Sequence, residues 1–572
     1  MRGSEGAAAR LKVVLCWHMH QPVYRDPAGR WRQPWTYLHA IKDYSDMAAY
    51  LEAEPAARAV VNFAPVLLEQ IEAYARELRA MLDGGAPVGD PLLAALSEHA
   101  LPTDARPRAA LIRAALRANE QRVIGRFKPF HELVALAHAA LDLEAPASNA
   151  CYLSDAFVHD LVVWYHLAWM GESVRRAHPL IGELEKTARG FTVGQRRALA
   201  ELIHEVIAGI IARYRALADS GRVELSVTPY AHPIVPLLLD FETARESMPT
   251  APLPEGEYPG GEARARRHIE HGIGVFEQYF GHRPQGCWPS EGAIDSGTAR
   301  LLGEYGFRWA ATGESVLTNT LGDARSKYRG KSWLYRPWQP DETPLAMFFR
   351  DDGLSDRIGF QYASWHADDA VANLTHALAD IAAHCNDPSR RVVSIILDGE
   401  NAWEYYPENA RYFLPALYKS LGEHPALELT TFSSALKTLR TETLPTPLVA
   451  GSWVHGTLAT WIGAFDKNRG WDLLVAAKKA FDEACESGLK GDRLAAAEQQ
   501  LSVCEGSDWF WWLGDYNPGE AVSDFERLYR AQLRELYRLI GVEPPAALDA
   551  VLSTGTGTPA TGGVMRTGQA TA

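Results

Sequence analysis

Two carboxylates and three aromatic rings follow an apolar run near residue 400. Residues 392–397 are β-branched or aliphatic at all but one position, which is typical of a strand covered on both faces in a parallel sheet. Asp398 and Glu400 come directly after the run, with Trp403 and two tyrosines just behind. Barrels and open α/β sheets build their sites at this end of the strands. Acids beside rings suit a sugar, because rings stack on apolar sugar faces while carboxyl groups act on the glycosidic oxygen.

Three further polar clusters lie where other predicted strands end. Taken singly, each has an ordinary explanation, since a lone strand-end histidine is often a core residue and a lone glutamate is often a cap. Parallel strands of one barrel end at the same rim, so clusters far apart in sequence would meet there. The clusters are His18 and His20 after residues 11–17, His232 after residues 223–227, and Trp288 with Glu291 after a turn at 285–287.

Composition excludes several classes of protein. The 57 basic and 71 acidic residues give a net charge of −14 with no basic block, which argues against nucleic acid and anionic membranes as partners. The six cysteines form no CxxC pair, which indicates free thiols in a reducing compartment. No signal-peptide pattern and no apolar run of about 18 residues is present, so we expect a cytoplasmic enzyme.

Alternating strand and helix patterns predict an α/β fold, an incomplete (β/α)7 barrel with parallel strands. A helical insertion interrupts the barrel, and a composition change near residue 440 marks a second region. Oligomeric state is not predicted. The expected organisation is a flexible lead at 1–10, the barrel at 11–440 with the insertion at about 90–220, an aromatic-rich loop and helical C-terminal domain at 441–552, and a disordered tail at 553–572.

Five ordered motifs together resemble those of glycoside hydrolase family 57. The resemblance spans roughly residues 11–530, and the segment at 349–360 resembles the family as well. The fourth and fifth motifs are more similar to amylopullulanase and α-amylase-type members than to branching enzymes or 4-α-glucanotransferases. The motifs are HMHQP at 18–22, ELSVTPYAHPI at 224–234, CWPSEGA at 287–293, LDGENAWEYYP at 397–407 and SDWFWWLGD at 507–515.

The resemblance implies a retaining enzyme that acts on an α-glucan without a metal or other cofactor. Glu291 matches the family's nucleophile and Asp398 its general acid/base, and both positions keep their carboxyl groups. With Asp398 protonated and Glu291 ionised, the two carboxyl groups should lie about 5–5.5 Å apart. Candidate substrate contacts are His18, His20, His232, Trp288, Glu400, Trp403, Asp508 and Trp509, together with Trp461 of the aromatic loop.

Other functions share parts of this pattern. A transglycosylase would use the same two carboxylates and differ only in whether water or a sugar hydroxyl resolves the intermediate. A metal-dependent polysaccharide deacetylase would instead use His18 and His20 with Asp351, Asp352 or Asp398 as ligands, although an HxH pair alone is a weak metal signal. A sugar-binding protein without activity is a fourth reading, against which the intact Glu291 and Asp398 pair argues.

Overall fold

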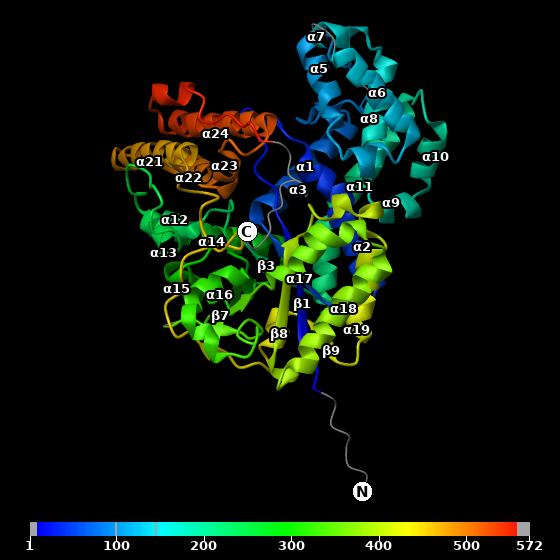
Figure 1. Cartoon of the computed structure of the whole chain (residues 1–572). Coiled ribbons are helices and arrows are strands. Elements are labelled where there is room, and N and C mark those ends of the chain that lie inside the picture. Colours follow the sequence, from blue (N-terminus) through cyan, green and yellow to red (C-terminus); the bar gives the residue numbers. More distant parts are fainter. Residues whose placement is uncertain (1–8, 98–99, 143–145, 342, 558–572) are drawn as a thin grey trace.

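The computed structural model describes residues 9–97, 100–142, 146–341 and 343–557 (Figure 1). Within them, a ten-stranded sheet has the order β10-β6-β7-β5-β4-β3-β2-β1-β8, with β9 also paired to β1. Seven of these strands run parallel to their neighbours and form the barrel. They are β1 (Leu11–Met19), β2 (Ala59–Phe63), β3 (Val223–Val227), β4 (Gly286–Cys287), β5 (Trp309–Thr312), β7 (Ala346–Phe349) and β8 (Val392–Asp398).

The seam between β7 and β8 closes the barrel. A single parallel bridge pairs Arg350 with Ser394 there, and the backbone N–H of Asp351 donates to the carbonyl of Ser394 at 2.8 Å. The Arg350 side chain also donates to the carbonyl of Ile396 at 2.8 Å. The predicted (β/α)7 barrel is therefore confirmed, and this sparsely paired seam is the place where it is incomplete.

Three strands were not predicted from the sequence because they are short or lack a strong apolar pattern. β6 (Trp338–Gln339) pairs antiparallel with β7, and β10 (Glu442–Thr443) extends that edge. β9 (Leu427–Thr430) pairs with the first half of β1, on the edge whose second half pairs with β2.

The register of the central strands fixes which residues share the upper rim. All nine residues of β1 are buried, as expected for a strand with neighbours on both edges and helices outside. His18 is paired with Asp398 on β8 and with Asn62 on β2, and Asn62 is paired in turn with Ser226 on β3. Polar side chains from four strands therefore meet at one level of the barrel.

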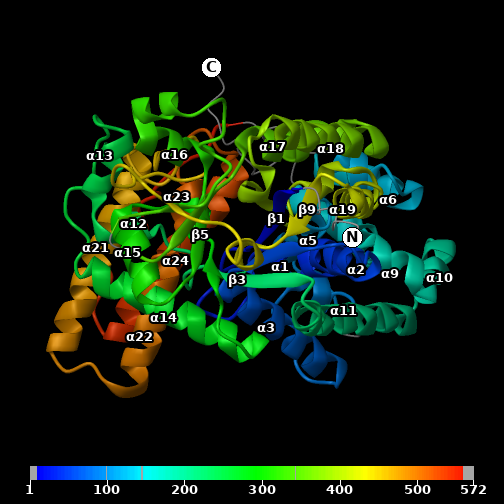
Figure 2. The same cartoon turned by 90° about the horizontal axis from the view of Figure 1, so that it is seen from below.

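Helices surround the strands on all sides when the molecule is viewed from below (Figure 2). Each crossover helix presents an apolar face to the sheet. The crossover helices include α3 (Pro65–Leu82), α14 (Gly261–Phe280), α15 (Ser296–Glu304), α16 (Glu314–Leu321), α18 (Ala367–His384) and α19 (Phe413–Glu423).

Two helical groups stand above the carboxyl ends of the strands (Figure 1). The insertion lies between β2 and β3. It ends in the 27-residue helix α11, whose start carries a capping box made by Thr192 and Gln195. The insertion contains α4 (Pro91–Ala94), α5 (Ala105–Ala114), α6 (Lys128–Leu141), α7 (Pro146–Asn149), α8 (Asp155–Trp169), α9 (Glu172–Ala177), α10 (Pro179–Thr187) and α11 (Val193–Asp219).

The second group is the helical C-terminal region. Residues 553–557, which were expected to begin a disordered tail, bind this region instead: the Ser553 hydroxyl donates to Asp466 at 2.7 Å. The rest of that tail, and residues 1–8 of the predicted flexible lead, lie outside the described residues. The group consists of α21 (Phe465–Glu486), α22 (Gly491–Cys504), α23 (Ser507–Trp512) and α24 (Gly519–Ile540).

Two properties of the chain bear on its environment. Among the described helices, none combines the length and the apolar character that crossing a bilayer requires. All six cysteines are free thiols, and three of them (Cys16, Cys287 and Cys504) are buried.

Candidate active site

A cavity of about 630 Å³ opens above the carboxyl ends of β1 and β8. Its floor is made by barrel residues, and its walls come from the insertion and from the C-terminal helices. Aromatic rings and carboxyl groups dominate the lining. The residues that line it include His18, His20, Trp35, His39, Asn119, Trp169, Glu291, Arg350, Asp398, Glu400, Glu404, Trp453, Asp508, Trp511, Trp512 and Asp524.

Glu291 lies in a strained turn directly after β4. Its backbone has φ 58° and ψ 22°, in the left-handed region that side chains other than glycine, asparagine and aspartate rarely adopt. Trp453 holds the turn from both ends: its indole N–H donates to Glu291 Oε2 at 3.0 Å, and its backbone N–H donates to the Glu291 carbonyl at 3.1 Å. Such strain persists where neighbours fix the conformation, and it is common at functional sites.

Asp398 is the last residue of β8 and faces the same cavity. The Asn401 amide donates to Asp398 Oδ2 at 3.3 Å. The next residue, Gly399, donates its backbone N–H to the His18 carbonyl at 2.7 Å. A Cβ at Gly399 would lie 2.2 Å from the sulfur of Met19, so a larger residue here would have to displace the Met19 side chain.

Burial and mutual repulsion shift the protonation of the two acids. Burial first, and the charge of Asp398 second, raise the pKa of Glu291 to about 8, although the Trp453 hydrogen bond acts in the opposite direction. Burial raises the pKa of Asp398 to about 6, against the hydrogen bond from Asn401 and the nearby His20. The pair therefore holds one proton between about pH 6 and pH 8.

Three histidine rings form a stack beside the two acids. The rings of His20 and His232 lie parallel with centroids 3.8 Å apart, and the His18 and His232 centroids are 5.3 Å apart. His18 and His20 line the cavity, whereas His232 is fully buried behind them. Burial lowers the pKa of His18 to about 3 and that of His232 well below its usual value, so both rings are neutral.

Glu400 supports the histidine cluster from below. Its side chain is only 2% exposed and accepts hydrogen bonds from the Tyr44 hydroxyl at 2.5 Å and from the backbone N–H of His20 at 2.9 Å. Burial, reinforced by the charge of Asp398, raises the pKa of Glu400 well above its usual value.

Asp508 reaches the cavity from the C-terminal helices. Its carboxylate lies 3.0 Å from the outer nitrogen of His20, although the two residues are 488 positions apart. A buried cluster just before α23 fixes this approach, because Glu505 accepts two hydrogen bonds from Arg264 at 2.7 and 2.8 Å and lies 2.7 Å from His268. Burial alone would raise the pKa of Glu505, but Arg264 and His268 together hold it well below its usual value.

Four tryptophans that were candidate sugar contacts lie in the core and do not line the cavity. Trp288 packs edge-on against Trp453 with centroids 5.2 Å apart, and Trp461 lies 5.9 Å from Trp511. Trp403 packs against Trp17, and Trp509 stacks on Tyr529. All four are at most 2% exposed, so they support the cavity wall from behind and we do not propose them as sugar contacts.

The aromatic wall comes from other residues. Trp453 belongs to the aromatic loop, and Trp511 and Trp512 come after the buried Trp509 on α23. None of the three lies at the end of a predicted strand, so the strand-end patterns did not single them out. Trp35 is the first residue of a short helix and Trp169 is the last residue of α8, both outside the five motifs, and Arg350 lies at the barrel seam. Only the presence of tryptophans in the insertion could have signalled Trp169.

A metal site is the remaining chemical possibility for these residues. His20, His232 and Asp508 place ligand atoms within 4.8 Å of one another. Most of their ligand atoms already have partners, however: His20 Nε2 binds Asp508 and both ring nitrogens of His232 have hydrogen-bond partners, whereas Nδ1 of His20 is buried without one. Of the three acids that a deacetylase site could use, Asp352 is paired with Arg350 at 2.8 Å and Asp351 with Tyr335 at 2.9 Å, both outside the cavity wall. Asp398 lines the cavity with His18 and His20, but among the described residues these three do not form a group with metal-binding spacing. The absence of a metal remains a prediction.

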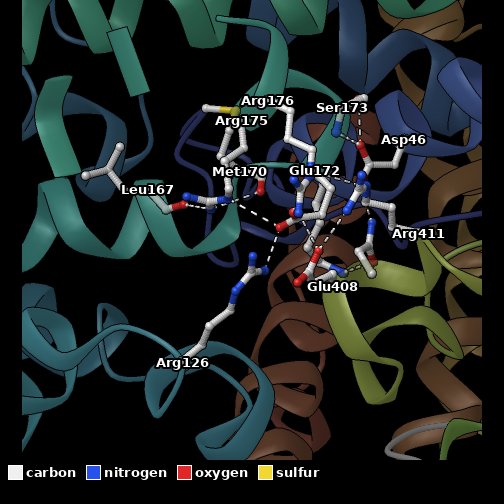
Figure 3. Close-up of polar contacts among 12 residues, drawn as sticks. Asp46, Arg126, Leu167, Met170, Glu172, Ser173, Arg175, Arg176, Glu408 and Arg411 are labelled. Carbon is white, nitrogen blue, oxygen red and sulfur yellow. Dashed lines mark hydrogen bonds and ion pairs between the residues drawn. The ribbon is translucent and has the colours of Figure 1, made fainter. Parts of the chain in front are cut away.

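An ionic network anchors the end of the loop that follows Asp398 (Figure 3). Glu172 of α9 is 1% exposed and contacts Arg126 at 2.5 Å, Arg175 at 3.3 Å and Arg176 at 3.5 Å. Arg176 then reaches Glu408 at 2.7 Å. The insertion is thereby tied to the segment that carries the fourth motif.

This segment contains three successive left-handed residues, Glu408, Asn409 and Ala410, with φ of 48°, 53° and 58°. The Asn409 amide donates to Asp46 at 2.9 Å and accepts from Lys42 at 3.0 Å. Asp46 also accepts from the backbone N–H groups of Glu172 and Ser173, both at 2.8 Å. These contacts hold a conformation that costs roughly 1–2 kcal/mol per residue for ordinary side chains.

We predict that replacing Asn409 by Ala and by Gly will separate strain from contact. Both variants lose the hydrogen bonds to Asp46 and Lys42, but Gly relieves the left-handed strain and Ala does not. Asn409→Ala should therefore be less stable than Asn409→Gly by about 1 kcal/mol in chemical unfolding. Equal stability of the two variants would show that this turn stores no strain.

Comparison with known proteins agrees with the geometry. Residues 14–447 match the sequence model of the family described as "Glycosyl hydrolase family 57". A 1,4-α-glucan branching enzyme of Thermococcus kodakarensis is 20% identical over 267 residues. That alignment spans 42% of this chain but only 36% of the relative's length.

Solved structures share the fold at low identity. The crystal structure of the T. kodakarensis branching enzyme has a TM-score of 0.54 at 15% identity, over 92% of this chain and 90% of that one. The α-amylase AmyC of Thermotoga maritima has a TM-score of 0.52 at 12% identity, over 95% of this chain and 99% of that one. These similarities concern the fold, whereas the family match covers most of the chain. The chain belongs to glycosyl hydrolase family 57.

Proposed function

We propose that this protein is an enzyme acting on α-1,4 glucosidic bonds of an α-glucan by a retaining double displacement. Glu291 is the nucleophile and Asp398 the general acid/base. One observation carries the proposal: the two carboxyl groups share one cavity, and the charge of Asp398 raises the pKa of Glu291. Two carboxyl groups at one substrate site are what glycoside hydrolysis requires, and the match of Glu291 and Asp398 to the family's motifs supports the retaining form of it.

The proposed mechanism divides the reaction between the two acids. Ionised Glu291 attacks the anomeric carbon while protonated Asp398 gives its proton to the leaving oxygen. Asp398 then removes a proton from water or a sugar hydroxyl, which attacks the anomeric carbon and releases Glu291. The Trp453 N–H at 3.0 Å stabilises Glu291 as a carboxylate, the form that attacks.

The proton must be on the correct acid when the substrate is bound. In the free cavity the higher pKa belongs to Glu291, so the single proton rests mainly there between about pH 6 and pH 8. Attack requires the proton on Asp398 instead. A glycosidic oxygen placed beside Asp398 accepts a hydrogen bond from its protonated form and favours that state.

The charge of the cavity supports a neutral sugar as substrate. Seven carboxyl groups line it against two guanidinium groups, those of Arg117 and Arg350. A sugar phosphate or a nucleotide sugar would be repelled by such a wall, whereas a neutral glucan can stack on the tryptophans and bind the acids through its hydroxyl groups. The carboxyl groups are those of Glu291, Asp398, Glu400, Glu404, Asp508, Glu520 and Asp524.

Transglycosylation is the second candidate, because the curated relative is a branching enzyme. The amylopullulanase-like character of two motifs favours hydrolysis, and AmyC, which shares the fold, is described as an α-amylase. Both outcomes use Glu291 and Asp398. They differ in whether water or a second chain reaches the intermediate beneath the insertion and the C-terminal helices.

The product profile tests the proposal. Starch, glycogen, pullulan and maltoheptaose should yield new reducing ends, or redistributed chain lengths in the case of transfer, equally with and without EDTA. Pullulan cleavage would extend the activity to α-1,6 bonds.

Glu291→Gln should lower turnover on the order of 10³-fold or more. Glu246→Gln, which neutralises an exposed carboxyl outside the cavity wall, is the control and should keep wild-type activity. Release of acetate with loss of activity in EDTA would reject the proposal in favour of a metal-dependent deacetylase.

We predict a bell-shaped pH dependence of kcat/KM with limbs near pH 6 and pH 8. Below the lower limb both acids are protonated and no carboxylate can attack. Above the upper limb both are ionised and no proton is available for the leaving oxygen. Rates measured from pH 4 to pH 10 that rise or fall without a second limb would contradict a one-proton pair.

A further inference from the structure

Every ring nitrogen of His18 and His232 has a partner within the protein. The two Nε2 atoms face each other at 3.2 Å, so one of them must carry a hydrogen and the other must accept it. At the outer ends, His18 Nδ1 lies 2.7 Å from Asn62 Oδ1, and His232 Nδ1 lies 2.8 Å from the Ser507 hydroxyl. Four side chains from β1, β2, the loop after β3 and α23 thus form one continuous chain of hydrogen bonds.

Asn62 sets the direction of this chain. Its amide nitrogen donates to the Ser226 hydroxyl at 3.1 Å, which turns its oxygen toward His18. His18 must therefore carry its hydrogen on Nδ1, and its Nε2 accepts. It follows that His232 donates from Nε2, and that its Nδ1 accepts from the Ser507 hydroxyl.

The Ser507 end of the chain lies beside the nucleophile. His232 Nδ1 is 3.9 Å from Glu291 Oε1, too far for a hydrogen bond but within reach after a small rotation of either side chain. While Nδ1 accepts from Ser507 it has no hydrogen to offer to Glu291. The opposite tautomer would place an N–H against the Glu291 carboxylate.

We propose that Ser507 is a positioning residue that, together with Asn62, fixes the tautomer of His232 and so keeps its ring from donating to Glu291. The inference rests on the proposed role of Glu291 as nucleophile. A hydrogen bond from His232 would disperse the charge of the attacking carboxylate and reduce its nucleophilicity. Ser507 precedes Asp508 on α23, so this assigns to the C-terminal helices a second role in the site besides the contact with His20.

The charged groups that face the pair are few, which makes the effect measurable. Asp398 and Asp508 face Glu291 and raise its pKa, while Trp453 donates to it. His18, His20 and Asp508 face His232, and Glu291 is the acid nearest to it. Removing the Ser507 hydroxyl changes none of these charges. It leaves the Nδ1 lone pair of His232 without a donor beside the Glu291 carboxylate. We expect the hydrogen then to move from Nε2 to Nδ1, at the cost of the bond to His18, and to be donated to Glu291, which stabilises the carboxylate.

The test is the pH profile of the full-length protein with maltoheptaose, for wild type, Ser507→Ala and Ser507→Thr. Ser507→Ala should move the alkaline limb of kcat/KM down by about one pH unit, the effect of one hydrogen bond to a charged group, and should lower kcat more than it changes KM. Ser507→Thr keeps the hydroxyl and should retain the wild-type limb. An unchanged alkaline limb in folded, active Ser507→Ala would overturn the inference.

Asn62 gives an independent measurement from the other end, for the case in which the buried Ser507 position accepts no substitution. Asn62→Ala removes the acceptor that orders the chain and should lower the alkaline limb as Ser507→Ala does. Asn62→Asp keeps the acceptor oxygen and should not lower it. If Asn62→Ala, Asn62→Asp and wild type all have the same alkaline limb of kcat/KM, the chain of hydrogen bonds does not control Glu291 and the inference is rejected. If the wild type itself has no activity on α-glucans, the proposed function fails, which is a different outcome from an active enzyme whose limbs ignore Ser507 and Asn62.

Discussion

The pairing of β1 with β8 is the constraint on which the site depends. His18 lies directly across from Asp398 in this ladder, and a slip of β8 by one residue would turn Asp398 to the opposite face of the sheet, away from His18. Buried apolar residues along β1 and β8 fix the register. Gly399 then lets the chain turn against Met19, whose side chain a Cβ at this position would displace. The position of Asp398, the proposed acid/base, is therefore set by strand packing rather than by its own contacts.

The opposite wall depends on buried polar contacts, because it is built from helices remote in sequence. Glu505 is satisfied by Arg264 and His268 in the interior, and a buried acid without such partners would be strongly destabilising. This cluster positions Asp508 against His20. On the other side, Asp46 and Glu172 bind the insertion to the loop after β8. The cavity thus closes only when the barrel, the insertion and the C-terminal helices are all in place.

The sequence was sufficient to predict the strands that carry the acids and the helices that separate them. An apolar run that ends in a polar cluster can be recognised from neighbouring residues alone, and the parallel topology of the sheet brings the ends of such strands together. The lining of the cavity was harder to predict. Trp288, Trp403, Trp461 and Trp509 occupy motif positions, yet they pack in the core, because a large ring serves as well behind a wall as on it. Whether a tryptophan faces sugar or protein depends on long-range packing, which the sequence pattern does not contain.

The stereochemistry of the first product tests the central claim most directly. Proton NMR of maltoheptaose, recorded during the first minutes of reaction, distinguishes the anomer released by the enzyme from the one formed later by mutarotation. A double displacement through Glu291 and Asp398 predicts that the new reducing end appears first as the α-anomer, with the configuration of the starting bond. Initial release of the β-anomer would contradict the account, because it requires a single displacement by water.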